Sequence, residues 1–562
     1  MAHERNPIDV FPEMREFWQA AAENRLLFKR CKACSRAHYY PRALCPFCQS
    51  SETEWWPSSG RGTIYSYSVA RREAIPCAPV VVELEDGIRL TSVVVHADLD
   101  ALHIGGEVTL HTLRGAGPPE IAFSTPEADA ARDHARRVID AAPQVPGLPA
   151  AHDADFQSAA IVGAGTMGVG ITMAFVNAGI PVMLLDRDDA SLQRALGRIR
   201  EQYEIAVQRK RLDAAAMRER LGLIAVGTDI AAIATADVVI EAVWEQMGLK
   251  RETFALIDQH ARPGALLGSN TSALDVNEIA AATRRPHDVL GLHFFTPAQS
   301  MKLLEIVRGR ATSPQALARA LVLGQRLKKT PVIVEVAPGF VGNRMFGRRE
   351  QEARRMLLEG APPEQIDRVL TDFGMPMGSF ELADMTSGIE LGYRRRQETG
   401  QKDPLGDRMF ESGRVGQKVG KGFYKYDPGS RKPKPDPELG QMLAEIAREV
   451  GIERRAISDD EIRDRLILSM INEGAKLLEE RVTERAGDID AVWLQGYGWP
   501  TWRGGPMYYA DRVGIAELHR RLQALMQIHG ERFAPSPLLT QMAAEGRGFF
   551  DGPAHGVQEG PQ

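Results

Sequence analysis

The chain has 562 residues, of which 44% are hydrophobic and 25% charged, a composition typical of an ordinary globular protein. At roughly 100–200 residues per domain, this length predicts several domains. The formal net charge of −5 and the pI of 6.3 argue against a general nucleic-acid-binding protein, which usually carries a basic surface. Five cysteines are too few for a disulfide scaffold, and the N-terminus shows no apolar signal core, so we expect a cytoplasmic protein.

The N-terminal region combines a predicted amphipathic helix, within residues 11–30, with two CxxC pairs that are separated by ten residues. A short strand, RLLFKR, leads into the first pair. This spacing is typical of a zinc ribbon, in which four thiolates form a closed tetrahedral site. Because such a site has no open position for a substrate water, a structural zinc is favoured over metal catalysis. The predicted ligands are Cys31, Cys34, Cys45 and Cys48.

Tyr39 and Tyr40 lie among basic residues beside the cysteines and could suggest nucleic-acid binding, but the acidic balance of the chain argues against it. Short alternating apolar runs then follow up to about residue 125, punctuated by Gly, Pro and Asp. They predict a small all-β domain, either a barrel or a sandwich. The next stretch, 126–156, is rich in Ala, Asp and Pro and is predicted to be a linker with one short helix.

From residue 157 the pattern changes to strands that alternate with helices, as in a parallel α/β sheet. Residues 157–185 carry no charge and could be mistaken for a membrane span. Glycines cluster near the start of this stretch, and Asn-Ala-Gly-Ile-Pro interrupts it. A strand, a tight turn, a helix and a second strand explain it better than one continuous helix, so we expect no membrane span.

The C-terminal part is predicted to be helical and internally duplicated. The stretches that begin at Ile366 and Ile489 share Ile-Asp, an aromatic residue before Gly, a Pro two positions further on, and then Ala-Asp. Two copies do not make a solenoid, so two related helical domains are expected. The stretch YDPGSRKPKPDPELG, rich in Pro and charge, is predicted to begin the linker between them.

The stretch AAIVGAGTMGVG contains a GxGxxG pattern that follows an apolar strand and opens a helix. Gly163 would make the turn, Gly165 would let the backbone approach a pyrophosphate, and Gly168 would let the helix pack on the strand. Asp186 ends the next strand 18 positions after Gly168 and can accept a hydrogen bond from a ribose 2′-hydroxyl. A carboxylate there repels a 2′-phosphate, which favours NAD over NADP.

Two further residues of the same loop, Thr166 and Met167, are expected to contact the cofactor. The alternative is a Gly-rich α/β turn that binds no ligand. Further along, GLHFFTPAQSMKLLEIV places His293 on one apolar strand and Glu305 on the next, and a turn between them could pair the two strands as a hairpin. A buried imidazole that faces a buried carboxylate is a general-base arrangement, whereas a lone histidine would more simply be a satisfied core residue.

Residues 158–430 resemble L-3-hydroxyacyl-CoA dehydrogenases. The matching stretches, in chain order, are IVGAGTMG, EAVWEQMGLK, SNTSAL, GLHFFTPAQSMKLLEIV, PGFVGNRM, MPMGSFELAD and GQKVGKGFYKY. The second helical copy, with GYGWPTWRGGPMYYAD, resembles that of the long multifunctional β-oxidation enzymes. In those enzymes an enoyl-CoA hydratase domain precedes the dehydrogenase, but no hydratase motif occurs in this chain.

The resemblance implies a role for each matching residue. His293 would take the proton from the 3-hydroxyl as hydride leaves C3 for the nicotinamide, and Glu305 would orient His293. Ser272 and Asn343 would hydrogen-bond the reacting oxygens and the nicotinamide side. The residues expected to contact the cofactor are Glu245, Lys250, Asn270 and Lys418.

Each assignment has a plainer alternative. Ser272 could be a helix N-cap, Glu245 and Lys250 a surface helical pair, and Lys418 a loop charge. Coenzyme A carries several phosphates and would attract the basic cluster around Arg209 and Lys210, which could equally be a solvated helix face.

Residues 12–125 resemble the zinc-ribbon/OB-fold proteins that accompany thiolases and other acyl-CoA enzymes. The matching features are FWQAAAENRLLFKRC, the four cysteines and GRGTIYSYSV. This resemblance implies an OB-fold and a module that docks a thiolase-type partner or helps to enclose the acyl-CoA. The alternative is a purely structural appendage.

Together these features predict an NAD-dependent enzyme that converts (S)-3-hydroxyacyl-CoA to 3-oxoacyl-CoA. The alternatives are a non-catalytic acyl-CoA scaffold and the same chemistry on a specialised aromatic or branched acyl-CoA. The predicted parts are 1–58 (helix and zinc ribbon), 59–125 (OB-fold), 126–156 (linker), 157–336 (NAD-binding Rossmann-type domain), 337–428 (first helical domain), 429–455 (linker), 456–550 (second helical domain) and 551–562 (disordered tail).

Overall fold

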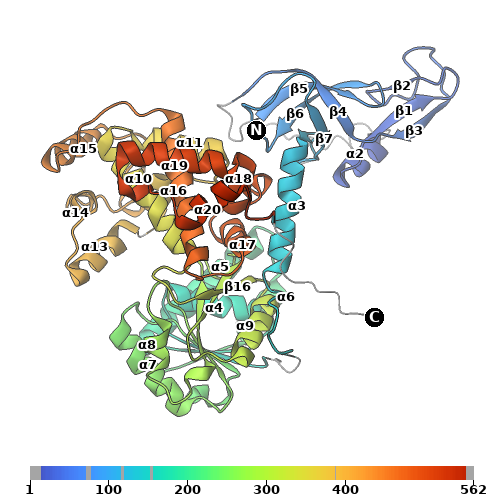
Figure 1. Cartoon of the computed structure of the whole chain (residues 1–562). Coiled ribbons are helices and arrows are strands. Elements are labelled where there is room, and N and C mark those ends of the chain that lie inside the picture. The colour runs from blue at the N-terminus through green and yellow to red at the C-terminus, as the bar shows by residue number, and fades with distance from the viewer. Residues whose placement is uncertain (1–13, 71–76, 115–118, 152–155, 387, 552–562) are drawn as a thin grey trace. The chain divides into compact units, whose positions relative to one another are not determined.

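The computed structural model describes residues 14–70, 77–114, 119–151, 156–386 and 388–551 (Figure 1). The chain divides into two compact units, residues 1–134 with 501–504 and residues 135–500 with 505–562. Helix α3 (Pro126–Ala141) begins in the first unit and ends in the second. It is longer than the short helix predicted in this stretch, because alanines buried along one side, such as Ala128 and Ala131, give it an apolar face.

The first unit starts with helix α2 (Arg15–Ala22), which buries Phe17 against a three-stranded sheet in the order β2-β1-β3. These strands are β1 (Leu27–Cys31), β2 (Ala37–His38) and β3 (Thr53–Pro57). A closed five-stranded barrel follows, in the order β4-β5-β6-β8-β7. Its strands are β4 (Arg61–Tyr67), β5 (Cys77–Leu84), β6 (Arg89–Val95), β7 (Glu107–Leu110) and β8 (Phe123–Ser124).

The second unit is built around an eight-stranded sheet in the order β11-β10-β9-β12-β13-β14-β15-β16. All neighbouring strands are parallel except β14 and β15, which pair antiparallel. The strands are β9 (Ala159–Val162), β10 (Val182–Leu185), β11 (Ile224–Gly227), β12 (Val238–Glu241), β13 (Leu266–Ser269), β14 (Val289–Phe294), β15 (Leu303–Arg308) and β16 (Thr330–Glu335).

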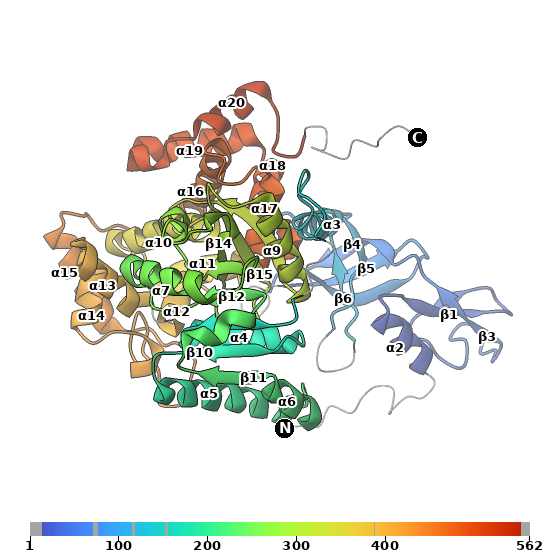
Figure 2. The same cartoon turned by 90° about the horizontal axis from the view of Figure 1, so that it is seen from below.

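Helices cover both faces of this sheet, as Figures 1 and 2 show. Alternate strand residues point to opposite faces, so Ile161 packs with α4, α5 and α9, whereas Ala160 and Val162 pack with α7 and α8. The covering helices are α4 (Thr166–Asn177), α5 (Asp189–Gln208), α6 (Ala214–Gly222), α7 (Met247–His260), α8 (Val276–Ala280) and α9 (Pro314–Arg326), with short 3₁₀ turns η2 (Ile230–Thr235) and η3 (Pro286–Asp288).

The rest of the second unit consists of helices, with yellow-orange and red segments gathered against one another in Figure 1. The first copy contains α10 (Gly342–Glu359), α11 (Pro363–Phe373), α12 (Ser379–Met385), α13 (Gly388–Thr399), α14 (Pro404–Glu411) and the turn η4 (Gln417–Val419). Helix α15 (Pro437–Glu449) follows it. The second copy contains α16 (Asp459–Glu479), α17 (Ala486–Gly496), α18 (Pro506–Val513), α19 (Ile515–His529), η6 (Glu531–Phe533) and α20 (Pro537–Glu545). The turn η5 (Thr501–Arg503), between α17 and α18 in the sequence, belongs to the first unit.

The predicted duplication is visible in the hydrogen bonds. Asp367 of α11 accepts the backbone N–H groups of Phe380 and Glu381 at the start of α12, both at 2.9 Å. Asp490 of α17 accepts those of Met507 and Tyr508 at the start of α18, at 2.7 and 3.2 Å. Each carboxylate therefore occupies the same structural position in its copy.

A second pair of carboxylates repeats in the same way. Asp384 accepts the N–H groups of Phe423 and Tyr424, and Asp511 accepts those of Phe549 and Phe550. In each copy the loop that donates these N–H groups begins with a glycine, Gly422 or Gly548, which has no room for a Cβ beside the carboxylate.

One predicted linker contains a helix that its sequence did not indicate. The stretch 429–455 includes α15, which is capped by Asp436 and buries Leu439, Leu443 and Ile446. Its Pro-rich start concealed an apolar stripe with helical spacing. The domain boundaries themselves remain predictions.

Candidate active site

The hairpin predicted for the catalytic pair is present. Strands β14 and β15 pair antiparallel, and His293 lies directly opposite Glu305. The imidazole Nδ1 and the carboxylate Oε2 are 2.7 Å apart, and the two residues are 6% and 0% exposed. With Nδ1–H donating a hydrogen bond to this carboxylate, the imidazole keeps its free electron pair on Nε2, as a general base requires.

The second oxygen of Glu305 is also engaged. Its Oε1 accepts the backbone N–H of Gly342, at the first turn of α10, at 3.0 Å. The carboxylate is thus fixed at both oxygens, and the ring of Phe295 lies 4.3 Å from the His293 ring. The histidine therefore has a single orientation that is set from two sides.

Asn343, the second residue of α10, lies next to the loop that follows β13. Its Nδ2 is 3.4 Å from the carbonyl oxygen of Ser272. Ser272 in turn donates from its backbone N–H and its hydroxyl to Glu245 Oε1, at 2.8 and 3.2 Å. Ser272 is not a helix cap, since α8 begins four residues later and is capped by Asp275.

Glu245 and Lys250 do form a pair, but not the surface pair considered above. The Lys250 side chain is completely buried and its Nζ lies 2.8 Å from Glu241, 3.3 Å from Glu245 and 3.2 Å from the carbonyl of Asn270. Burial opposes ionisation of Glu245, but Lys250 and hydrogen bonds from Ser272 and other donors outweigh it and lower its pKa. Burial raises the pKa of Glu241 despite the same ammonium.

Asn270 links this charged group to the catalytic strand. Its Oδ1 accepts the backbone N–H of Phe294, which follows His293, at 3.1 Å. Asn270, Glu245, Lys250, Ser272 and the His293 hairpin therefore form one connected set at the carboxyl ends of neighbouring strands, where ligands bind in open α/β sheets.

The glycine-rich loop has the geometry that a dinucleotide requires. Gly163 has φ +111°, and an added Cβ there would meet the carbonyl oxygen of Ala242 at 2.6 Å. A Cβ on Gly168 would lie only 1.8 Å from the carbonyl oxygen of Gly163, so helix α4 packs closely on the strand. Gly165, in contrast, faces open space at the helix N-terminus, and Thr166 beside it is exposed. This is where a pyrophosphate would approach.

Two predicted cofactor residues of this loop have partners within the protein. Asp186 lies just after β10, and its Oδ2 accepts the N–H of Ala164 at 2.7 Å, so it shapes the loop. Each carboxylate oxygen can accept a further bond, which leaves capacity for a ribose hydroxyl. Met167 is half-buried, and its sulfur accepts the hydroxyl of Thr296 at 2.9 Å.

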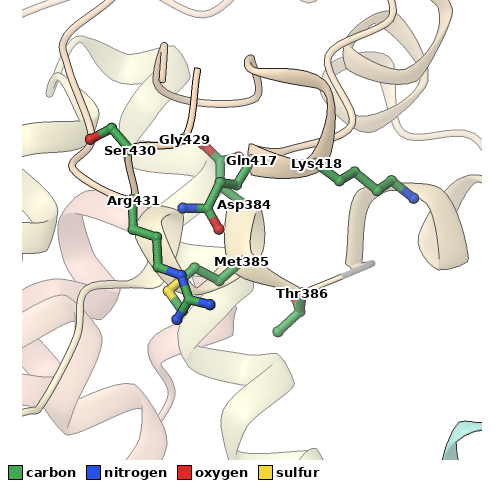
Figure 3. Close-up of a pocket in the computed structure, with 8 residues that line it drawn as sticks. All are labelled: Asp384, Met385, Thr386, Gln417, Lys418, Gly429, Ser430 and Arg431. Atoms are coloured by element: carbon green, nitrogen blue, oxygen red, sulfur yellow. The ribbon is translucent and has the colours of Figure 1, made fainter. Parts of the chain in front are cut away.

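Lys418 lies apart from this set, in η4 of the first helical copy. Its ammonium pairs with Glu390 of α13. It also lines a cavity of about 340 Å³ (Figure 3). The other lining residues are Asp384, Met385, Thr386, Gln417, Gly429, Ser430 and Arg431.

Arg209 and Lys210 lie just beyond the end of α5, and both are exposed. Lys210 has a positive φ of 54°, so the basic cluster occupies the turn after the helix rather than its face. Whether it binds coenzyme A stays a prediction.

Two participants were missed from the sequence. Glu241 is the last residue of β12, and its one local signal is an acidic side chain at the end of an apolar strand. Tyr497, at the end of α17, donates its hydroxyl to Asn343 Oδ1 at 2.8 Å, across 154 residues of sequence. No local pattern indicates such a contact.

Comparison with known families assigns the central and C-terminal parts of the chain. The family described as "3-hydroxyacyl-CoA dehydrogenase, NAD binding domain" matches residues 158–337. The corresponding C-terminal domain matches twice, at residues 339–426 and 462–548, which confirms the duplication. The chain belongs to the 3-hydroxyacyl-CoA dehydrogenase family. The predicted fold class and the resemblance to this family are thereby confirmed.

Similar proteins agree with that assignment. The "Peroxisomal bifunctional enzyme" of Danio rerio is 39% identical over 415 residues, which cover 70% of this chain and 57% of the relative. A crystal structure of 3-hydroxybutyryl-CoA dehydrogenase from Escherichia coli K12 is 27% identical, with a TM-score of 0.61, and covers 70% of this chain and 99% of that one. The chain spans about half the length of the curated relatives that it matches.

The N-terminal part of the chain matches two further families. Residues 18–54 match "ChsH2, rubredoxin-like zinc ribbon domain", and residues 55–113 match "ChsH2, C-terminal OB-fold domain". A solved structure named "Ltp2-ChsH2(DUF35) aldolase" is 30% identical and covers 20% of this chain and 94% of that one, with a TM-score of 0.19.

The four ribbon cysteines come together as predicted. Cys31 ends β1, and the Sγ atoms of all four cysteines lie within 4.8 Å of one another. The closest pairs are Cys31 with Cys48 at 3.5 Å and Cys34 with Cys45 at 3.6 Å. Four converging thiols fit a tetrahedral metal ion. Among the described residues no helix is long and apolar enough to cross a membrane.

Proposed function

We propose that this chain catalyses the NAD-dependent oxidation of (S)-3-hydroxyacyl-CoA to 3-oxoacyl-CoA. The observation that carries the proposal is the buried His293–Glu305 pair, with its 2.7 Å contact at Nδ1. NAD, when bound, would supply the hydride acceptor for C3 of the substrate. His293 Nε2 would take the proton of the 3-hydroxyl, and Glu305 would stabilise the imidazolium that results.

Asn343 and Ser272 support the reacting oxygen in this proposal. Both lie at the same end of the sheet as His293. Their donors are now held by Ser272 O and Glu245, and the Asn343 amide and the Ser272 hydroxyl would turn to the substrate oxygen when it binds. Glu245, Lys250 and Asn270 would hold the nicotinamide side from the adjacent strand ends. Gly163, Gly165 and Gly168 would receive the pyrophosphate, with Asp186 at the ribose. The proposed coenzyme is therefore NAD rather than NADP.

The test is NADH oxidation with acetoacetyl-CoA, followed by a panel of longer, branched and aromatic 3-oxoacyl-CoAs. Substitution of His293 by Ala should lower turnover at least ~100-fold, because the general base is lost. His287→Ala, at an exposed histidine in η3, serves as the matched control and should leave turnover unchanged. Normal turnover of a folded His293→Ala protein would refute the proposal, and inactivity of the wild type on every thioester would favour a non-catalytic scaffold.

We further propose that the four cysteines hold one structural zinc ion. The converging thiolates would supply all four ligands, so the ion would stabilise the ribbon and take no part in hydride transfer. Metal analysis of the purified chain should give one zinc per protein, and Cys34→Ser should abolish it while turnover stays normal. Zinc bound in full to the Cys34→Ser protein would contradict this assignment.

The barrel is proposed to dock a thiolase-type partner that would use the 3-oxoacyl-CoA product. Tyr65 of β4 is 47% exposed, and the Arg89 guanidinium lies 3.7 Å from its ring centre, so an aromatic and cationic surface is available. With a purified thiolase that accepts the product, Tyr65→Ala should weaken the complex in sedimentation experiments. A complex of unchanged affinity would exclude this surface. The cytoplasmic location predicted from the sequence remains a prediction.

A further inference from the structure

The second helical copy reaches the catalytic hairpin through the C-terminal end of α17. Gly496 ends this helix, and an added Cβ there would lie 2.4 Å from Cδ2 of Leu303, the first residue of β15. The helix therefore packs directly on the strand that carries Glu305. The next residue along the chain is Tyr497.

Tyr497 is enclosed by aromatic rings. Its ring centre is 4.7 Å from that of Trp493, 5.5 Å from that of Phe295 and 5.7 Å from that of Phe346. A Cβ added to Gly342 would lie 2.3 Å from Cε2 of Tyr497, so only glycine permits this approach. The ring thus lies against the residue whose N–H binds Glu305, and it has little freedom to move.

We propose that Tyr497 is a positioning residue of the dehydrogenase site. Its hydroxyl holds Oδ1 of Asn343 at 2.8 Å, so that the Asn343 Nδ2 is presented toward Ser272 and the reacting oxygen. The inference rests on the proposed function and assigns part of the reaction to the second helical copy.

The physical reason lies in the two ends of a carboxamide. Rotation of the Asn343 carboxamide by 180° about χ2 exchanges the Nδ2 donor for the Oδ1 acceptor. An acceptor directed at the reacting oxygen would repel the negative charge that develops there. A hydroxyl that donates to Oδ1 favours one of the two orientations. Burial, and then the nearby Glu305 carboxylate, raise the pKa of Tyr497 well above its ordinary value, so the hydroxyl keeps its proton.

The first experiment compares Tyr497→Phe with the wild type. The substitution removes one oxygen and keeps the ring, so the fold, the melting temperature and NADH affinity should change little. We expect kcat to fall roughly five- to tenfold while KM for acetoacetyl-CoA stays within about twofold, since one hydrogen bond is lost from the transition state. Tyr203→Phe is the matched control, because Tyr203 is a buried tyrosine that donates to the Asn177 carboxamide oxygen at 2.9 Å, away from the hairpin.

The second experiment repeats Tyr497→Phe in an Asn343→Ala background. A hydroxyl that acts through Asn343 has nothing to position there, so the kcat ratio between the two proteins should approach one. A full five- to tenfold effect in that background would overturn the proposal, and so would wild-type kcat in Tyr497→Phe alone. A wild type that turns over none of the thioesters would overturn the proposed function and this inference with it, whereas active wild type with an unaffected Tyr497→Phe variant overturns the inference only.

Discussion

The first helical copy carries Asn343 at the start of α10 and Lys418 in the loop after α14, whereas the second copy carries Tyr497 at the end of α17. The stretch PGFVGNRM, which holds Asn343, has no counterpart before α16, where the chain reads IERRAISDD. At the position of Tyr497 in its repeat, the first copy has Phe373, which packs against Trp499 instead.

What the copies share is the set of carboxylates that receive backbone N–H groups. Asp367 and Asp490 do so at one point of the repeat, and Asp384 and Asp511 at another. Buried N–H groups must be satisfied in either copy, so the repeats retain these residues. The copies differ in the side chains that they direct to the site: the first copy supplies Asn343, and the second supplies Tyr497.

The strongest test of their association is Arg465, a completely buried residue of α16 whose guanidinium binds Glu352 and Glu359 of α10. Arg465→Ala leaves two buried carboxylates without their main cation. We expect the free energy of unfolding in urea to fall by about 3–5 kcal/mol. Arg463→Ala, two residues earlier at an exposed ion pair, is the control and should cost less than ~0.5 kcal/mol. Equal losses in both variants would show that the buried network does not join the copies.

A pH profile examines the carboxylates of the first copy. Burial raises the pKa of Asp367 to about 6, and the same cause raises that of Asp384 to about 6. A carboxyl whose pKa is higher in the folded state stabilises the protein below its unfolded pKa of 3.8, and this contribution disappears as the pH rises through 6. Each group should therefore remove up to ~3 kcal/mol of unfolding free energy between pH 4 and pH 6.5.

The asparagine in Asp367→Asn cannot ionise, so the free energy of unfolding should depend less on pH between 4 and 6.5. Urea unfolding at each pH measures this dependence. The double variant with Asp384→Asn should flatten it further. An unchanged slope in the double variant would mean that both groups stay ionised in the folded protein.

The close approach of the second copy to the site is tested at Gly342. In Gly342→Ala the new methyl group displaces the Tyr497 ring, so we expect kcat to fall at least ~10-fold, by loss of the Asn343 contact. Gly347→Ala, in the same helix, is the matched control because its Cβ would meet open space. It should raise the unfolding free energy by about 0.5–1 kcal/mol and leave turnover unchanged. Wild-type turnover in Gly342→Ala would show that the approach is not needed.

The smallest expected effect is that of the Tyr424 hydroxyl, which the second copy lacks. Tyr424 donates to Asp367 at 2.8 Å, and the residue at the same point of the second copy is Phe550. Tyr424→Phe makes the first copy resemble the second and should cost about 1 kcal/mol in thermal unfolding. Tyr393→Phe, which keeps the ring stacked on Phe410, should cost less. No loss in Tyr424→Phe would indicate that both copies tolerate the carboxylate without a hydroxyl.

The sequence predicted those parts of the site that are encoded locally. The glycine fingerprint, the two CxxC pairs and the His293–Glu305 hairpin each lie within a few dozen residues, and the ribbon and hairpin partners do meet. The repeated Ile-Asp stretches were sufficient to predict the duplication. Helices α3 and α15 were underestimated because Ala, Pro and charged residues also typify linkers.

Local sequence patterns did not predict contacts that form only when separate elements pack together. Glu241 becomes notable only once Lys250, nine residues later, is seen to be buried against it. Tyr497 meets Asn343 only when two helical copies have folded and packed. For Lys250 the sequence left a surface helical pair open as the alternative to a cofactor contact, and its burial on α7 removes that alternative.

The contacts of the hairpin imply an order of assembly during synthesis on the ribosome. Glu305 follows His293 by 12 residues, Gly342 follows Glu305 by 37, and Tyr497 follows Asn343 by 154. Since domains tend to fold in the order in which they emerge, the base and its carboxylate meet early, while the carboxamide is oriented last. A nascent chain that has not yet presented α17 would thus hold the His293–Glu305 pair before the Asn343 carboxamide has received its hydrogen bond from Tyr497.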